Sequence, residues 1–144
     1  MTPSIVDSMA GQHEVLDARL IATAHHLDAG AMAAAGAALV ELAAGLRQHI
    51  EVEEAHLFPA FEALPHADLA IAVEMRTQHR NLEQLVAAMR AALDRRDRST
   101  ALHAKAALHA ALGRHDDDEE AICAALDRGL DAGARAQLIA QLGR

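Results

Sequence analysis

The chain has 144 residues, a length that suits one compact domain, and its formal net charge is −8. Alanine fills 36 positions, Trp and Tyr are absent, and Val, Ile and Thr together supply only 16 residues. Sheets use β-branched and aromatic residues, whereas alanine and leucine favour helices, so we expect an all-helical protein. The acidic balance and the lack of stacking aromatics argue against a nucleic-acid surface. The single cysteine excludes an intramolecular disulfide and a cysteine-rich metal site.

The first residues, MTPSIVDSMAGQHE, lack the basic and apolar segments of a signal peptide. The sequence also has no uninterrupted apolar run of about 18 residues, the length that a membrane-spanning helix needs. We therefore expect a soluble, cytoplasmic protein that binds neither a membrane nor nucleic acid. One number stands out from this plain helical composition, namely the ten histidines.

Breakers and capping residues divide the chain into four long helices and a short fifth helix. Ser4 is the expected cap of the first helix, and Ser99 or Thr100 that of the fourth. Pro65 falls in a turn, whereas Pro59 lies inside the second helix and should kink its last turn because it lacks a backbone N–H. The first helix should reach about Asp28, and the next ones should cover about Met32–Glu62, Ala67–Arg95, a stretch ending near Asp127, and Ala134–Leu142.

Each long segment carries apolar residues at helical spacing, which is typical of the amphipathic helices of an up-down-up-down four-helix bundle. In the second segment, Leu39, Leu42 and Leu46 form such a stripe. Four histidines continue these stripes, one in each long segment: His13, His49, His79 and His115. We therefore expect these four side chains to point into the bundle.

An internal repeat links the four histidines. His13 and His79 are 66 residues apart, and so are His49 and His115. Further residues match at the same offset: Gln12 and Gln78, Leu16 and Leu82, Leu27 and Leu93, Asp28 and Asp94, Leu42 and Leu108, Leu46 and Leu112, Glu53 and Glu119, Glu54 and Glu120, and Leu64 and Leu130. We predict one domain, residues 1–144, built from a duplicated helical hairpin at about 11–64 and 77–130.

Each half also contains the pattern His-x-x-x-Glu, at His49 and Glu53 and again at His115 and Glu119. Residues four apart share one face of a helix, so each pair can reach the same buried metal. Two hairpins would then bring four histidines and two glutamates to one cavity. This set suits a pair of iron ions, and burying two glutamates without a compensating cation would be costly.

These residues resemble a known family. The pattern H…HxxxE…H…HxxxE and the segment HIEVEEAHLFPAFEAL are similar to the hemerythrin-like, or HHE cation-binding, domain, over about residues 5–128. The resemblance implies a four-helix bundle with a non-haem di-iron centre. The implied ligands are His13 and His49 on one iron, His79 and His115 on the other, and Glu53 and Glu119 as bridges beside an oxo or hydroxo bridge.

The chain departs from the oxygen-carrying hemerythrins, which have five histidines, with HxxxH on the third helix and HxxxxD on the fourth. Here Glu83 lies four residues after His79. Glu83 and its repeat partner Asp17 are candidates either for additional ligands or for accepting a proton from a ligand imidazole.

Two further side chains leave alternatives open. Glu120 matches the spacing of HxxxxD and is an alternative to Glu119, although the repeat favours Glu119. His56 lies two turns beyond His49 on the same face. It can contact a ligand residue, line the mouth of a pocket, or simply fill the core.

Two histidines per iron would leave open coordination positions on both metals. The first function hypothesis is therefore a binding or sensing module for oxygen, nitric oxide or peroxide, or an iron-handling protein. The alternative is a di-iron oxidoreductase that disproportionates hydrogen peroxide, which needs no external electron donor. No catalytic side chain is assigned beyond the metal centre, and a metal-free interaction domain is a third, weaker hypothesis.

Overall fold

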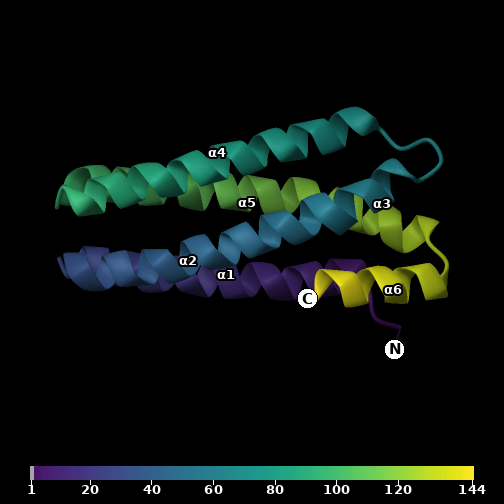
Figure 1. The fold of residues 1–144 in the computed structure, drawn as a ribbon, viewed down its shortest axis with the longest axis horizontal. Helices are drawn as coiled ribbons and strands as arrows, with labels where there is room; N and C mark the ends of the chain where they lie inside the picture. The colour runs from purple at the N-terminus through teal and green to yellow at the C-terminus, as the bar shows by residue number, and fades with distance from the viewer. Residues whose placement is uncertain (1) are drawn as a thin grey trace.

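The fold is a bundle of antiparallel helices, and the computed structural model describes residues 2–144 (Figure 1). The elements are, in chain order, α1 (Ile5–Asp28), α2 (Met32–Val52), the π-helical turn η1 (Glu53–Leu57), α3 (Phe58–Glu62), α4 (Leu69–Asp94), α5 (Arg98–Gly129) and α6 (Ala132–Leu142). α1 packs against α2 and α5, and α4 packs against α2 and α5. This arrangement confirms the predicted all-helical bundle. No helix in the described part of the chain is both long enough and apolar enough to cross a membrane.

The N-terminal cap of α5 corrects one prediction. Asp97, and not Ser99 or Thr100, caps this helix: its carboxylate accepts hydrogen bonds from the Thr100 backbone N–H at 3.1 Å and from the Thr100 hydroxyl at 2.6 Å. A carboxylate at this position satisfies a free backbone donor and also suits the positive end of the helix dipole. Ser4 caps α1 as predicted. The other predicted helix ends lie within two residues of the observed ones.

The irregularity expected at Pro59 lies just upstream of that residue and has a different form. α2 passes into α3 through η1, where the Phe58 N–H donates to the Glu53 carbonyl, five residues earlier. Pro59 then follows within the same continuous helical path, and because it has no N–H it donates no hydrogen bond to the preceding turn. The wide π turn therefore coincides with Glu53, one of the predicted metal ligands. Such turns occur frequently at functional sites.

The interior consists of two apolar clusters with a polar layer between them. One cluster is centred on Leu39, Leu42, Leu82 and Leu108, and the other contains Phe58 and residues of α1, α5 and α6. The buried polar side chains, apart from Thr23, are His49, Glu53, His79, His115 and Glu119. Charged or hydrogen-bonding groups are rarely placed in such a layer without partners, so this layer is the first candidate for a functional site.

The short helix α6 folds back onto the bundle. It contacts α1 and η1, and Figure 1 shows it (yellow) lying beside α1 with its end towards the middle of the bundle. Leu138 and Leu142 of α6 are buried in the second apolar cluster. The C-terminal end of the described chain is thereby held close to the polar layer.

Candidate metal centre

The structure brings all six predicted ligand residues together in the polar layer. α1 contributes His13, α2 and η1 contribute His49 and Glu53, α4 contributes His79, and α5 contributes His115 and Glu119. Five of these side chains are buried, whereas the His13 side chain is 15% exposed. The inward apolar stripe of each helix places these residues at the bundle axis.

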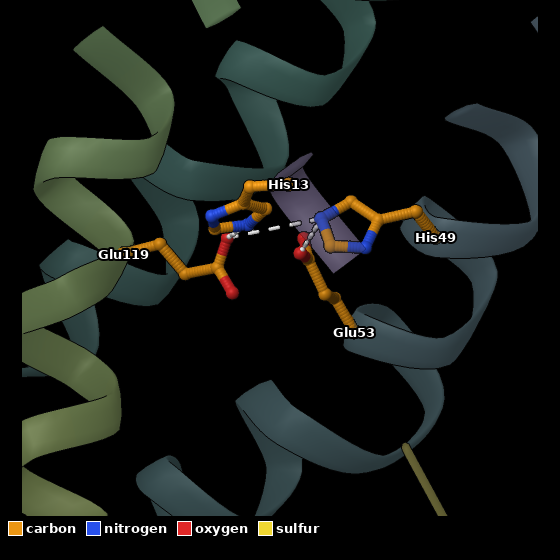
Figure 2. Close-up of side chains that lie close together, drawn as sticks. All are labelled: His13, His49, Glu53 and Glu119. Atoms are coloured by element: carbon orange, nitrogen blue, oxygen red, sulfur yellow. Dashed lines mark hydrogen bonds and ion pairs between the residues drawn. The ribbon is translucent and has the colours of Figure 1, made fainter. Parts of the chain in front are cut away.

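The six side chains form two groups of atoms that can ligate a metal. His13, His49, Glu53 and Glu119 form the first group, and Glu53, His79 and His115 form the second; within each group the ligand atoms lie within 4.8 Å of one another. Figure 2 shows the first group, with the side chains from facing helices pointing towards one another. Glu53 belongs to both groups and therefore joins them.

Distances within the layer show that both carboxylates face histidines of both halves. Glu53 Oε2 lies 2.7 Å from His79 Nε2 and 3.5 Å from His115 Nε2. Glu119 Oε2 lies 3.1 Å from His13 Nε2, 3.6 Å from His115 Nε2 and 3.9 Å from His49 Nε2. His49 Nε2 and Glu53 Oε1 are in contact.

Three of these atoms are buried without a hydrogen bond that meets the usual geometry: His49 Nε2 and Glu53 Oε1, which contact each other, and His115 Nε2. Each unpaired buried polar atom lowers the stability of the fold by about 1–3 kcal/mol. Three of them in one place are unusual in a protein core. Nitrogen and carboxylate lone pairs that converge without donors are what a cation requires. The donor set therefore fits metal ions, and ions bound in the two groups would together satisfy all three atoms.

Glutamines outside the layer hold two of the imidazoles. His49 Nδ1 donates to Gln12 Oε1 at 2.9 Å, and His115 Nδ1 donates to Gln78 Oε1 at 3.0 Å. These bonds leave the Nε2 atoms of both rings facing the cavity. The two glutamines are 66 residues apart, so the repeat contained a signal for them, but their role was not predicted.

The other two histidines have different outer partners. His79 Nδ1 lies 2.8 Å from Glu54 Oε1, and Arg80 also binds this oxygen at 2.7 Å. The 66-residue offset relates Glu54 to Glu120 and Arg80 to Glu14, so the residues equivalent to this acid and base are two acids. Both are exposed, and among the described residues neither makes with His13 the hydrogen bond that Glu54 makes with His79.

The four additional candidates lie outside both groups. Asp17, Glu83 and Glu120 are exposed, and the Glu83 carboxylate pairs with Arg80 at 3.0 Å. His56 is half-buried within η1. At the fourth helix it is therefore Glu119, and not Glu120, that turns into the layer.

Asp116 was not predicted as part of the site, because the run Asp116–Asp118 has the pattern of a solvated face. Its Oδ1 lies 3.5 Å from His13 Nε2. A pocket of about 220 Å³ opens here, lined by residues that include His13, Asp116, Glu120 and Cys123. His13, the most exposed residue of the layer, lines this pocket. Elsewhere in the layer the buried Phe58 ring stacks on His79, with ring centroids 5.2 Å apart.

The pKa values of the two glutamates are shifted in opposite directions. Burial, followed by the charge of Glu53, raises the pKa of Glu119 to about 7 against the opposing effect of His13 and His49. Burial also acts to raise the pKa of Glu53, but His49, His115 and His79 outweigh it and hold that pKa well below its ordinary value. Two buried carboxylates this close together resist being charged at the same time unless positive charge accompanies them.

The comparisons with known proteins agree with this geometry. The family model for the hemerythrin HHE cation binding domain matches residues 4–125. This match includes all six residues of the polar layer, and it confirms the resemblance found in the sequence. No curated protein and no solved structure matches the chain.

Proposed function

The chain belongs to the hemerythrin HHE cation-binding domain family, and from this membership and the geometry of the polar layer we propose that it binds two iron ions. The proposed ligands are His13 and His49 for one ion, His79 and His115 for the other, and Glu53 and Glu119 as carboxylates facing both. The observation that carries the proposal is the set of buried lone pairs without hydrogen bonds at the junction of the two groups. A cytoplasmic location and a single-domain organisation stay predictions.

The choice of iron is supported by the donor set. The two groups contain imidazole nitrogens and carboxylate oxygens but no thiolate, and such mixed nitrogen and oxygen sites suit iron. The one cysteine, Cys123, is buried and lies outside both groups. Burial raises the pKa of its thiol, so it stays protonated and does not compete for the metal.

We further propose that the centre binds a small ligand, namely oxygen, nitric oxide or peroxide, from the His13 side. When bound, the iron ions supply the open coordination and the redox chemistry that such ligands require. The pocket beside His13 has room for a small molecule, and Asp116 lines it together with His13. Phe58 and His79 are both fully buried and stack on each other, so neither ring offers a route for the ligand.

A test begins with metal-free protein, which is titrated with ferrous iron without oxygen and then exposed to each ligand in turn. We expect two iron ions per chain and a reversible change in near-ultraviolet absorption when the ligand is added and removed. His13→Ala should weaken this change, whereas His103→Ala, at an exposed histidine on α5, is the matched control.

The same experiment separates the alternative functions. Sustained evolution of oxygen from hydrogen peroxide would contradict the binding function and support the oxidoreductase alternative. Failure to bind iron, or a clear preference for zinc in stoichiometric amounts, would contradict the proposal as a whole.

A further inference from the structure

Each of the two glutamines that hold a ligand histidine is itself held at its other end. Gln78 Nε2 donates to Asp118 Oδ2 at 2.8 Å while Gln78 Oε1 accepts from His115. Gln12 Nε2 donates to the Leu142 carbonyl at 2.8 Å while Gln12 Oε1 accepts from His49. In each half, an outer acceptor binds the glutamine and the glutamine binds the histidine, an arrangement that we call the relay. The two halves differ in the outer acceptor, which is Asp118 in one and the Leu142 carbonyl in the other.

The outer acceptor determines which nitrogen of the histidine carries a proton. A carbonyl or carboxylate oxygen only accepts, so it must face the NH₂ group of the glutamine. The amide oxygen of the glutamine then faces the imidazole, and Nδ1 must carry the proton. Nε2 is left with its lone pair towards the cavity, as metal binding requires. Without the outer acceptor, the amide can rotate and donate to Nδ1, which would favour the wrong tautomer.

The predicted repeat explains why the acceptors differ. Asp118 lies three residues after His115, and the equivalent position, three residues after His49, is Val52. A valine side chain accepts no hydrogen bond, so the first half lacks its own acceptor. The Leu142 carbonyl comes from the end of α6, which lies beyond the repeated hairpins and beyond the family match at residues 4–125.

α6 is anchored well enough to serve as this acceptor. Leu138 and Leu142 are 5% and 2% exposed and pack in the apolar cluster that contains Met9 of α1. Gln48 Nε2 also donates to the Arg144 carbonyl at 3.2 Å. These contacts hold the C-terminal end of α6 beside Gln12 of α1 and Gln48 of α2, next to His49.

We propose that α6 is a positioning element of the metal centre. It supplies, through the Leu142 carbonyl and Gln12, the orientation of His49 that Asp118 and Gln78 supply for His115. The proposal rests on the metal-binding function proposed above, but its first test needs no metal.

The test measures, by nuclear magnetic resonance of the metal-free full chain, how fast the Nδ1–H protons of His49 and His115 exchange with solvent. The double substitution Leu138→Asp and Leu142→Asp should release α6 and speed exchange at His49 by about 10-fold, as loss of one ordinary hydrogen bond predicts. His115 should be unaffected. Gln137→Asp, at an exposed position of α6, is the control, and amide exchange within α6 reports its release.

Two further variants separate positioning from general loosening of the bundle. Asp118→Val should speed exchange at His115 and leave His49 unchanged. Adding Val52→Asp to the α6 double variant should restore slow exchange at His49, because it places an acceptor where the second half has Asp118, whereas Val52→Ala should not. Equal effects on both histidines, no effect at His49 with α6 released, or failure of Val52→Asp to rescue would each overturn the proposal.

A metal readout then connects the relay to the site. The affinity of the α6 double variant for iron, measured by competition with a chelator, should fall about 10-fold, as is typical when a partner outside the ligands is lost, and Val52→Asp should restore it. If the wild-type chain binds no metal while the exchange results hold, the proposed function fails and the relay stands. If iron binds and the exchange results do not hold, the relay alone fails.

Discussion

Replacing Glu53 with Gln should remove more metal than replacing Glu119 with Gln, although the two residues are equivalent in the repeat. Glu53 belongs to both groups of ligand atoms, whereas Glu119 belongs to the first group and approaches the second only at His115 Nε2, 3.6 Å away. Glutamine keeps the size of glutamate but lacks its negative charge, so each substitution removes one anionic ligand with little change in packing. The two variants therefore differ mainly in how many groups lose a ligand.

The expected losses follow from the composition of the groups. Glu53→Gln reduces the first group from four candidate ligand residues to three and the second from three to two. Glu119→Gln reduces the first group from four to three and leaves the second at three. Two histidines alone are a poor site for iron, so Glu53→Gln should retain at most one ion per chain. Glu119→Gln should retain two, with the first bound more weakly.

Metal analysis of both variants after iron loading and gel filtration measures this difference, with thermal unfolding as the control for folding. Equal iron content in the two variants would refute the assignment of Glu53 as the shared ligand. A larger loss in Glu119→Gln would reverse the assignment.

Three other outcomes concern stability and pH. Phe58→Ala should lower the free energy of unfolding by about 3–5 kcal/mol because this ring is fully buried. Urea unfolding measures the loss. A loss below about 1 kcal/mol would contradict this prediction and show that the surrounding side chains collapse into the cavity. Asp97→Ala should lower the free energy of unfolding by about 1 kcal/mol through loss of the α5 cap. The matched control, Ser99→Ala, should change it by no more than about 0.5 kcal/mol. Equal losses for the two variants in urea unfolding would favour Ser99, the cap predicted from the sequence. The folded metal-free protein holds the Glu119 carboxyl at a pKa of about 7, above its ordinary 4.5, so it binds more protons than the unfolded chain between these pH values. Its stability should therefore fall as pH rises from about 4.5 to about 7, and a rise in unfolding midpoint over that range would contradict the cause given for the shift.

The fold and the inward histidines were predictable because both depend on periodicity. Apolar residues at helical spacing indicate a buried stripe, and a histidine that continues the stripe must share its direction. The repeat then excluded coincidence, since His49 and His115 recur with Glu53 and Glu119 at one offset. These signals are local or regular, so they survive without knowledge of the tertiary contacts.

The surroundings of the layer were harder to predict, for physical reasons that differ from residue to residue. Asp116 belongs to an acidic run whose pattern indicates a solvated face, and only the approach of α1 brings His13 to it. The Leu142 carbonyl is a main-chain group, which any residue type would provide, so the sequence carries no sign of its role. Pro59 pointed to an irregular turn, but the form of η1 depends on how the whole helix packs.

The most direct test of the central proposal is anomalous X-ray scattering at the iron edge from crystals of the iron-loaded chain. The account predicts two iron peaks in the polar layer, one beside the Nε2 atoms of His13 and His49 and one beside those of His79 and His115, with Glu53 between them. A single peak, or peaks at the exposed acidic residues with the layer left without metal, would contradict it.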